Sequence, residues 1–142
     1  MSEIRFFNED IIYIIRNKAA VRKWIGNAIV KEGFRLKELN YIYCSDAHLH
    51  KMNEHYLHHH TYTDIITFDL SKNKKEVEGE IYISTDRVRE NAILFKVSLR
   101  DELHRVMIHG VLHLCGYKDK TARDVKRMRN KEDYYLSLRS IL

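Results

Sequence analysis

The chain has 142 residues, of which 44% are hydrophobic and 32% are charged, and this composition is typical of one globular domain. It has no proline, no apolar run of the roughly 18 residues that a membrane span needs, and no signal-peptide pattern, so we expect a single domain over residues 1–142, in the cytoplasm and without a membrane partner. The formal net charge of +5 favours polyanionic partners such as nucleic acid, although many basic proteins bind none.

Hydrophobic periodicity and turn residues divide the chain into mixed strands and helices. The predicted elements, in chain order, are a strand over Ile4–Asn8, a helix over Ala19–Glu32, a strand over Glu38–Cys44, a helix capped by Ser45 or Asp46 that runs to about Tyr56, a strand over Thr63–Leu70, a charged turn over Lys72–Glu78, a strand over Gly79–Ser84, a helix capped by Thr85 or Asp86 that runs to about Phe95, a helix over Leu99–Cys115 capped by Ser98, and a basic helix from about Ala122 to the end. This order predicts an α/β (α+β) fold, a single layer of about four mostly parallel strands packed with about five helices.

The segment from His109 to Asp119 carries the most informative pattern. His109 and His113 are four residues apart, so on a helix they differ by about 40° around the axis and by about 6 Å along it. Asp119 could not join them if the helix continued, but Gly116 can end the helix and turn the chain back. The neighbouring residues are apolar, which indicates a buried helix in which histidines need partners. We therefore predict a metal site formed by His109, His113 and Asp119.

Three protein ligands leave a fourth position open, as in catalytic zinc sites. The predicted cofactor is one Zn2+ per chain, which would polarise a phosphoryl or carbonyl oxygen. Because one ligand is a carboxylate, Mn, Co and Ni remain alternatives. Cys115 lies about 200° around the helix from His113, so we expect it to point away from the metal. Cys115 and Cys44 are both interpreted as buried small hydrophobic residues rather than as a disulfide.

The pattern His-x-x-x-His-x-x-Gly-x-x-Asp has the spacing of elongated zinc-peptidase motifs, but those enzymes carry a glutamate where this chain has Gly110. With that glycine included, the string His-Gly-Val-Leu-His-Leu-Cys-Gly-Tyr resembles the signature of the YbeY family of rRNA-maturation endoribonucleases. The match extends from about Asn40 to Glu132, and it includes Met52-Asn53, Thr63-Asp64-Ile65-Ile66-Thr67-Phe68, Gly79-Glu80-Ile81-Tyr82-Ile83-Ser84 and Glu102.

This resemblance implies a zinc-dependent, single-strand-specific endoribonuclease that acts in 16S rRNA 3′-end maturation and ribosome quality control. The implied partners are single-stranded RNA, including rRNA, and the small ribosomal subunit, and no DNA is expected. Two positions depart from the family pattern. Asp119 stands where the family usually has a third histidine ligand, and Leu57 stands where it commonly has an arginine thought to face the substrate. Arg105, one turn before His109, is a candidate for the missing phosphate contact, with a plain surface arginine as the alternative.

Several other residues have two interpretations. His58, His59 and His60 are expected to form a solvated loop rather than a second metal site. A basic stripe on the last helix either steers phosphates or is a solvated face; it comprises Lys120, Arg123, Arg127 and Lys131. Asp64, Thr67 and Glu102 could hold the outer nitrogens of the ligand imidazoles.

Two other functions remain open from the sequence. A zinc metallopeptidase fits the ligand spacing but lacks the glutamate base at Gly110. A ribosome-assembly factor in which the metal only stabilises the fold fits the absence of the arginine at Leu57.

Overall fold

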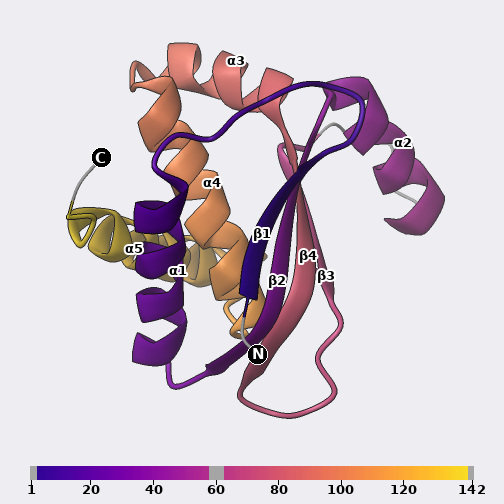
Figure 1. The fold of residues 1–142 in the computed structure, drawn as a ribbon. Helices are drawn as coiled ribbons and strands as arrows, with labels where there is room; N and C mark the ends of the chain where they lie inside the picture. Colours follow the sequence, from indigo (N-terminus) through magenta and orange to yellow (C-terminus); the bar gives the residue numbers. More distant parts are fainter. Residues whose placement is uncertain (1–2, 58–62, 141–142) are drawn as a thin grey trace.

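The computed structural model describes residues 3–57 and 63–140. Its elements, in chain order, are β1 (Glu3–Asn8), α1 (Lys18–Lys31), β2 (Arg35–Cys44), α2 (Asp46–Leu57), β3 (Ile65–Asp69), β4 (Glu76–Ser84), α3 (Thr85–Phe95), α4 (Leu99–Leu114) and α5 (Ala122–Ser137) (Figure 1). All the expected strands and helices form. Two expected N-caps are confirmed, because Oγ of Ser45 and Oγ of Ser98 each accept a hydrogen bond at 3.0 Å from the amide three residues later.

Two strand boundaries differ from the expectation, and both differences have one cause. β2 begins at Arg35 rather than at Glu38, and β4 begins at Glu76, inside the segment 72–78 expected to be a turn. Arg35 and Glu76 are partners in the parallel pairing of β2 with β4, and their side chains form an ion pair. Glu76 is buried although its segment was expected to be a charged turn, because its pairing partner lies about forty residues away and is invisible in local sequence.

The N-cap of α3 also differs from the expectation by one residue. Oγ of Ser84 accepts a hydrogen bond from the Arg87 amide at 3.1 Å, so Ser84 is the cap rather than Thr85 or Asp86. Ser84 is also the last residue of β4, so the strand runs directly into the helix.

The four strands form one sheet in the order β1-β2-β4-β3. β2 is parallel to both β1 and β4, whereas the short β3 runs antiparallel to β4 along the edge. The prediction of an α/β fold with one layer of four mostly parallel strands and five helices is therefore confirmed for the described residues.

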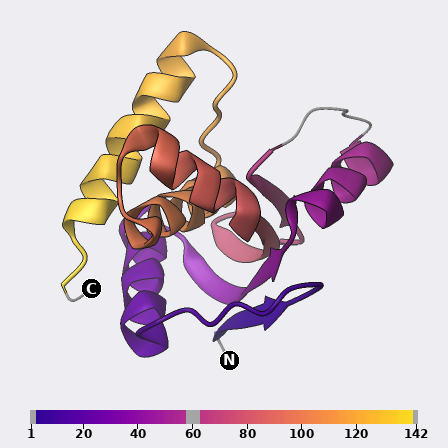
Figure 2. The ribbon, with the colours of Figure 1, turned by 90° about the horizontal axis from the view of Figure 1, so that it is seen from above.

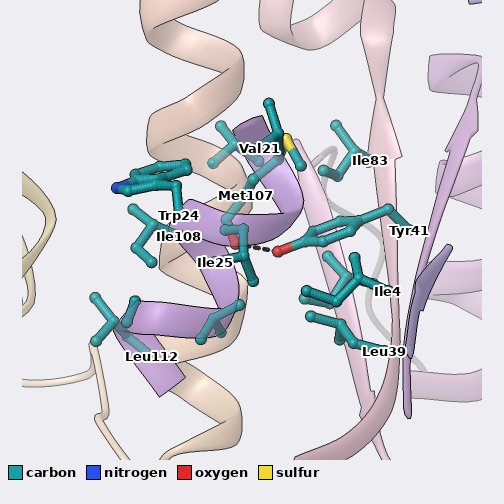
Figure 3. Packing of buried hydrophobic residues seen from close by; sticks show 14 of the residues in the cluster. Ile4, Val21, Trp24, Ile25, Leu39, Tyr41, Ile83, Met107, Ile108 and Leu112 are labelled. Atoms are coloured by element: carbon teal, nitrogen blue, oxygen red, sulfur yellow. Dashed lines mark hydrogen bonds between the residues drawn. The ribbon is translucent and has the colours of Figure 1, made fainter. Parts of the chain in front are cut away.

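Helices cover both faces of the sheet. α1 and α4 lie on one face and α2 lies on the other (Figures 1 and 2), while α5 packs against α4. The larger core cluster fills the space between α1, α4 and the sheet, where the buried hydroxyl of Tyr41 donates a hydrogen bond to the backbone oxygen of Met107 at 3.0 Å (Figure 3). A smaller cluster contains Cys44, Leu49 and Ile66. The helix that carries both histidine ligands is thus fixed against the sheet by the main core, and its expected burial is confirmed.

α4 packs tightly on the sheet at Gly110. A Cβ atom at this position would lie 2.9 Å from Cδ1 of Ile65 on β3 and 2.9 Å from Cδ1 of Ile81 on β4. Carbon atoms do not pack this closely, so a side chain here would require the two isoleucine side chains or the helix to shift. The glycine therefore allows the close contact between α4 and the sheet.

Two further expectations from the sequence concern membrane crossing and the environment of the two cysteines. Among the described residues, no helix combines the length and the hydropathy that crossing a bilayer requires. Cys44 is fully buried and Cys115 is partly buried, and both are free thiols. Burial raises the pKa of each thiol to about 12, so both are protonated and unreactive at neutral pH.

Candidate metal centre

α4 places His109 and His113 one turn apart, with their ring centroids 4.5 Å from each other. The helix ends immediately after them, because Gly116 has a φ of +99°. The Gly116 amide donates to the backbone oxygen of His113, and the Tyr117 amide donates to that of Leu112, each at 3.0 Å. This pair of hydrogen bonds around a left-handed glycine is a Schellman motif, which reverses the chain direction.

The reversal brings Asp119 opposite the two imidazoles. Its Oδ2 atom lies 3.2 Å from Nε2 of His113 and 3.5 Å from Nε2 of His109. One ligand atom from each residue lies within 4.8 Å of the other two, and within residues 3–57 and 63–140 no other such group of three occurs. Two imidazole nitrogens and one carboxylate oxygen form a donor set that suits zinc and related ions. The structure thus brings together the three residues predicted as ligands and gives them the chemistry of a metal site.

The outer nitrogens of both imidazoles contact oxygen acceptors. Nδ1 of His109 lies 2.6 Å from Oε2 of Glu132 on α5, and Nδ1 of His113 lies 2.9 Å from the backbone oxygen of Tyr117. Because a carboxylate and a carbonyl only accept hydrogen bonds, each Nδ1 carries a proton, so Nε2 of each ring, which faces Asp119, is the nitrogen available to a metal. A metal-ligating histidine holds its outer N–H in this way.

The electrostatic field at His109 favours positive charge. Burial by itself lowers the pKa of His109, but the hydrogen bond and the charge of Glu132 outweigh burial, and Asp64 and Asp119 add to the effect. The pKa of His109 is therefore raised. The same carboxylates would stabilise a cation held between the imidazoles and Asp119.

A pocket of about 300 Å³ opens beside His109 and Asp119. α4 and α5 form its long walls, and residues of α3 and the start of β3 close it. Besides Asp119, three carboxylate residues line it, namely Asp64, Glu102 and Glu132, together with the two arginines Arg105 and Arg129. The ligand group therefore lies at the side of a cavity rather than in a closed structural site.

Comparison with known proteins identifies the family. The sequence model described as endoribonuclease YbeY matches residues 4–139. The chain belongs to the endoribonuclease YbeY family. Endoribonuclease YbeY of Cytophaga hutchinsonii is 53% identical over 136 residues, which are 96% of this chain and 95% of that protein. The Flavobacterium psychrophilum protein is 50% identical over 132 residues, 93% and 94% of the two chains.

A solved structure shares the fold. The solution structure of TM1509 from Thermotoga maritima superposes with a TM-score of 0.65 at 28% identity, over 95% of this chain and 87% of that one. The expected resemblance to the YbeY family is thus confirmed, and with it the expected enzyme class, a hydrolase of the endoribonuclease type.

The structure adds a physical reason against the peptidase alternative. In zinc peptidases the glutamate after the first histidine ligand acts as a general base. Here that position is Gly110, which faces Ile65 and Ile81 across the helix–sheet contact. A glutamate at this position would be forced against the core rather than into the pocket beside His109.

Arg105 lies one turn before His109, and it lines the same pocket. Its Nη1 atom donates to Oε1 of Glu132 at 2.8 Å, and its Nη2 atom donates to Oδ1 of Asp133 at 2.6 Å. It is therefore not a plain surface arginine, since two of its N–H groups hold carboxylates of α5. The remaining N–H groups leave it able to contact a phosphate.

The hypothesis about the partners of the ligand imidazoles was wrong in detail. Glu132 and the Tyr117 carbonyl occupy both Nδ1 positions, which excludes Asp64, Thr67 and Glu102 from that role. A signal for Glu132 was present in the sequence, because an acidic residue interrupts the buried face of the last helix formed by Met128 and Tyr135. Its partner could not be read from that signal.

The basic stripe on α5 divides into two halves. Arg127 stacks over the Tyr117 ring at 5.1 Å, and Nζ of Lys131 lies 3.2 Å from Oε2 of Glu32, so both contribute to packing. Lys120, Arg123 and Arg127 are exposed, and Lys120 lies just before α5.

Two features predicted from the sequence lie wholly or partly outside the described residues. The histidine run His58 to His60 lies outside the described residues. The backbone of Leu57 ends α2, while its side chain is not described.

Proposed function

We propose that this chain is a zinc-dependent, single-strand-specific endoribonuclease that acts in 16S rRNA 3′-end maturation and ribosome quality control, as one domain over residues 1–142 in the cytoplasm. The observation that carries the proposal is the group of His109, His113 and Asp119 at the side of an open pocket. Family membership over residues 4–139 supports the reaction class, and the motif resemblance supports the rRNA substrate.

The donor set fits the proposed metal. Zinc in catalytic sites takes three protein ligands from histidine and carboxylate side chains, and it supplies Lewis acidity toward a phosphodiester when bound. Nδ1 of His109 and Nδ1 of His113 already have their acceptors, so Nε2 of each ring is left to bind the metal with little rearrangement. Asp119 as the oxygen donor leaves Mn, Co and Ni as competing ions.

The chain's own residues would position the substrate. Glu132 accepts hydrogen bonds from the imidazole of His109 and from the guanidinium of Arg105. These three side chains are therefore connected through one carboxylate. Arg105 and Arg129 line the pocket beside this unit, and Arg129 is largely exposed, with its guanidinium 3.9 Å from Glu132. We propose both arginines as contacts for the RNA backbone, with Arg105 also positioning Glu132.

The proposed partners follow from charge and family. A formal charge of +5 and the exposed Lys120 and Arg123 next to Asp119 favour a polyanion at this face. We propose single-stranded RNA and the small ribosomal subunit as partners, and we expect no DNA substrate.

The test uses protein purified without a histidine tag. Bound metal is measured by mass spectrometry in the wild type and in His113→Ala, and cleavage of single-stranded RNA is measured on the same samples with and without a chelator. We expect about one zinc per wild-type chain and RNA cleavage that the chelator abolishes, with both lost in His113→Ala. Stable zinc without RNA cleavage, together with an Asp119→Ala variant that still supports ribosome maturation, would instead establish a non-catalytic assembly factor.

A further inference from the structure

The pocket beside His109 contains a buried carboxylate, that of Glu102, which has no role in binding the metal or the RNA backbone. Glu102 lies on α4, two turns before His109, and only 5% of its surface is exposed. It lines the pocket, yet among the described residues its carboxylate makes no hydrogen bond and no ion pair of the kind that satisfies Glu132. Its oxygen atoms are not enclosed by protein, so the carboxylate is open to the pocket and its position points to a ligand that supplies hydrogen-bond donors.

The acidic part of the pocket is unsuited to phosphate. The charge of Asp64 disfavours the ionised form of Glu102, and the charge of Glu132 disfavours the ionised forms of both residues. Burial raises the pKa of Glu102 and the charge of Asp64 adds to the rise, while Arg105 and Arg129 oppose it. An anion entering here would meet the carboxylates of Asp64, Glu102 and Glu132, whereas Arg105 on α4 and Arg129 on α5 are available for the RNA backbone.

A second metal ion is also a poor fit. Three ligand atoms must converge on one point to hold such an ion, and within the described residues only His109, His113 and Asp119 do so. The lining also includes apolar side chains, among them Val106, Val125 and Met128. Apolar side chains beside the Glu102 carboxylate, which has no donor among the described residues, suit a flat, neutral ring that carries N–H donors on its edge.

A nucleobase of single-stranded RNA has this character. Proteins that read such bases stack them against side chains and form hydrogen bonds with their Watson–Crick edges. An ionised carboxylate only accepts hydrogen bonds, and it does so through two adjacent oxygens. Guanine is the base whose Watson–Crick edge presents two adjacent donors, N1–H and the N2 amino group, whereas the other three bases each present one donor group there.

We propose that this pocket binds the guanine base of an RNA nucleotide adjacent to the cleaved phosphate, with Glu102 accepting hydrogen bonds from N1–H and N2–H. The inference rests on the proposed endoribonuclease function, and it specifies the base that the site prefers. Glu102 is thus a specificity-determining residue, separate from the metal ligands.

The first test uses nucleosides, which carry no phosphate and therefore do not engage the metal or the arginines. Guanosine, adenosine, cytidine, uridine and inosine are titrated into the metal-free protein, and the methyl signals of Ile65 and Met128 on the pocket wall are followed by NMR. Guanosine should bind about tenfold more tightly than the other natural nucleosides, and inosine, which lacks the N2 amino group, should bind about tenfold more weakly than guanosine. Equal affinities, or no shift at either methyl group, would overturn the proposal without reference to any mutant.

The second test changes the protein. Glu102→Gln replaces one acceptor oxygen by an amide donor and should reduce guanosine binding to the level of adenosine, while zinc content measured by mass spectrometry stays unchanged. Glu90→Gln is the matched control, because Glu90 lies on α3 with its side chain 68% exposed and is outside the pocket lining. Loss of the guanosine preference in Glu90→Gln, or its retention in a folded Glu102→Gln, would contradict the role of Glu102.

A cleavage assay separates this inference from the proposed function. Single-stranded oligonucleotides that contain one guanosine in a uridine or adenosine background are incubated with the zinc-loaded protein. Cleavage concentrated beside the guanosine supports the pocket, and uniform cleavage overturns it while leaving the endoribonuclease intact. If no RNA is cut, the proposed function fails, and the nucleoside titration alone decides whether the pocket binds guanine.

Discussion

Nδ1 of His109 on α4 lies 2.6 Å from Oε2 of Glu132 on α5, although the two residues are 23 positions apart in the chain. Glu132 also accepts a hydrogen bond from Arg105, so one buried carboxylate connects a metal ligand to a pocket arginine. The contact between α4 and α5 is therefore part of the candidate metal centre. A histidine held in this way keeps its orientation and its tautomer before the metal arrives.

Replacing Glu132 by glutamine should weaken zinc binding. The amide can still accept from Nδ1 of His109, but it lacks the charge that raises the pKa of His109. We expect the zinc affinity to fall by at least about tenfold, as is typical when such a partner is altered. A competition titration with a chromophoric chelator measures the change. Asp133→Asn is the control, because Asp133 contacts Arg105 without reaching His109, and equal affinities for both variants would show that Glu132 does not support the ligand.

Replacing Asp119 by histidine should alter metal choice. A third imidazole nitrogen favours zinc, whereas a carboxylate oxygen also suits manganese. We expect the ratio of zinc affinity to manganese affinity to rise by about tenfold in Asp119→His, measured by the same competition titration with each ion. Asp119→Ala should weaken the binding of both ions. If Asp119→His leaves the ratio unchanged, the aspartate does not set the metal preference.

Replacing Gly110 by alanine should destabilise the protein. The added methyl group would lie 2.9 Å from Cδ1 of Ile65 and from Cδ1 of Ile81, so these side chains or α4 must shift. We expect a loss of about 1–3 kcal/mol in the free energy of unfolding, measured by urea denaturation in the presence of a chelator. Gly26→Ala in α1 is the matched control, because no atom lies within 4 Å of its added Cβ, and it should gain about 1 kcal/mol. A similar effect of both changes would show that the tight helix–sheet contact does not require a glycine.

Stability should decrease in mild acid because of His104. Burial, and next the charges of Arg139 and Arg100, lower the pKa of this imidazole from 6.5 to about 4. As the pH falls from about 6.5 to 4, the unfolded chain binds a proton that the folded protein rejects, so the free energy of unfolding falls, by up to about 3 kcal/mol from this group.

Urea denaturation of the wild type and of His104→Gln at several pH values isolates this contribution. The variant should lose less stability than the wild type between pH 6.5 and 4, because other groups titrate alike in both proteins. Parallel curves for the two proteins would mean that His104 is protonated in the folded state.

Much of the fold and the ligand set follows from local sequence. Hydrophobic periodicity spans a single turn or strand, and Ser45 and Ser98 cap their helices through amides three residues away. His109 and His113 share a helix face because four residues nearly complete a turn, and Gly116 supplies the left-handed conformation that brings Asp119 back. Each of these features depends on neighbours within about ten residues, so the sequence predicted them.

The tertiary structure alone decided the surroundings of those ligands. Which side chain meets Nδ1 of His109 depends on how α5 crosses α4, and a lone acidic residue on a buried helix face does not specify its partner. The starts of β2 and β4 were predicted too late in the chain for the same reason, since Arg35 pairs with Glu76 from a distant segment. Gly110 was read from the sequence as a missing catalytic base, but in the folded chain it is the point where α4 touches the sheet. Contacts between distant segments are fixed by the packing of whole elements, and no local pattern of residues encodes them.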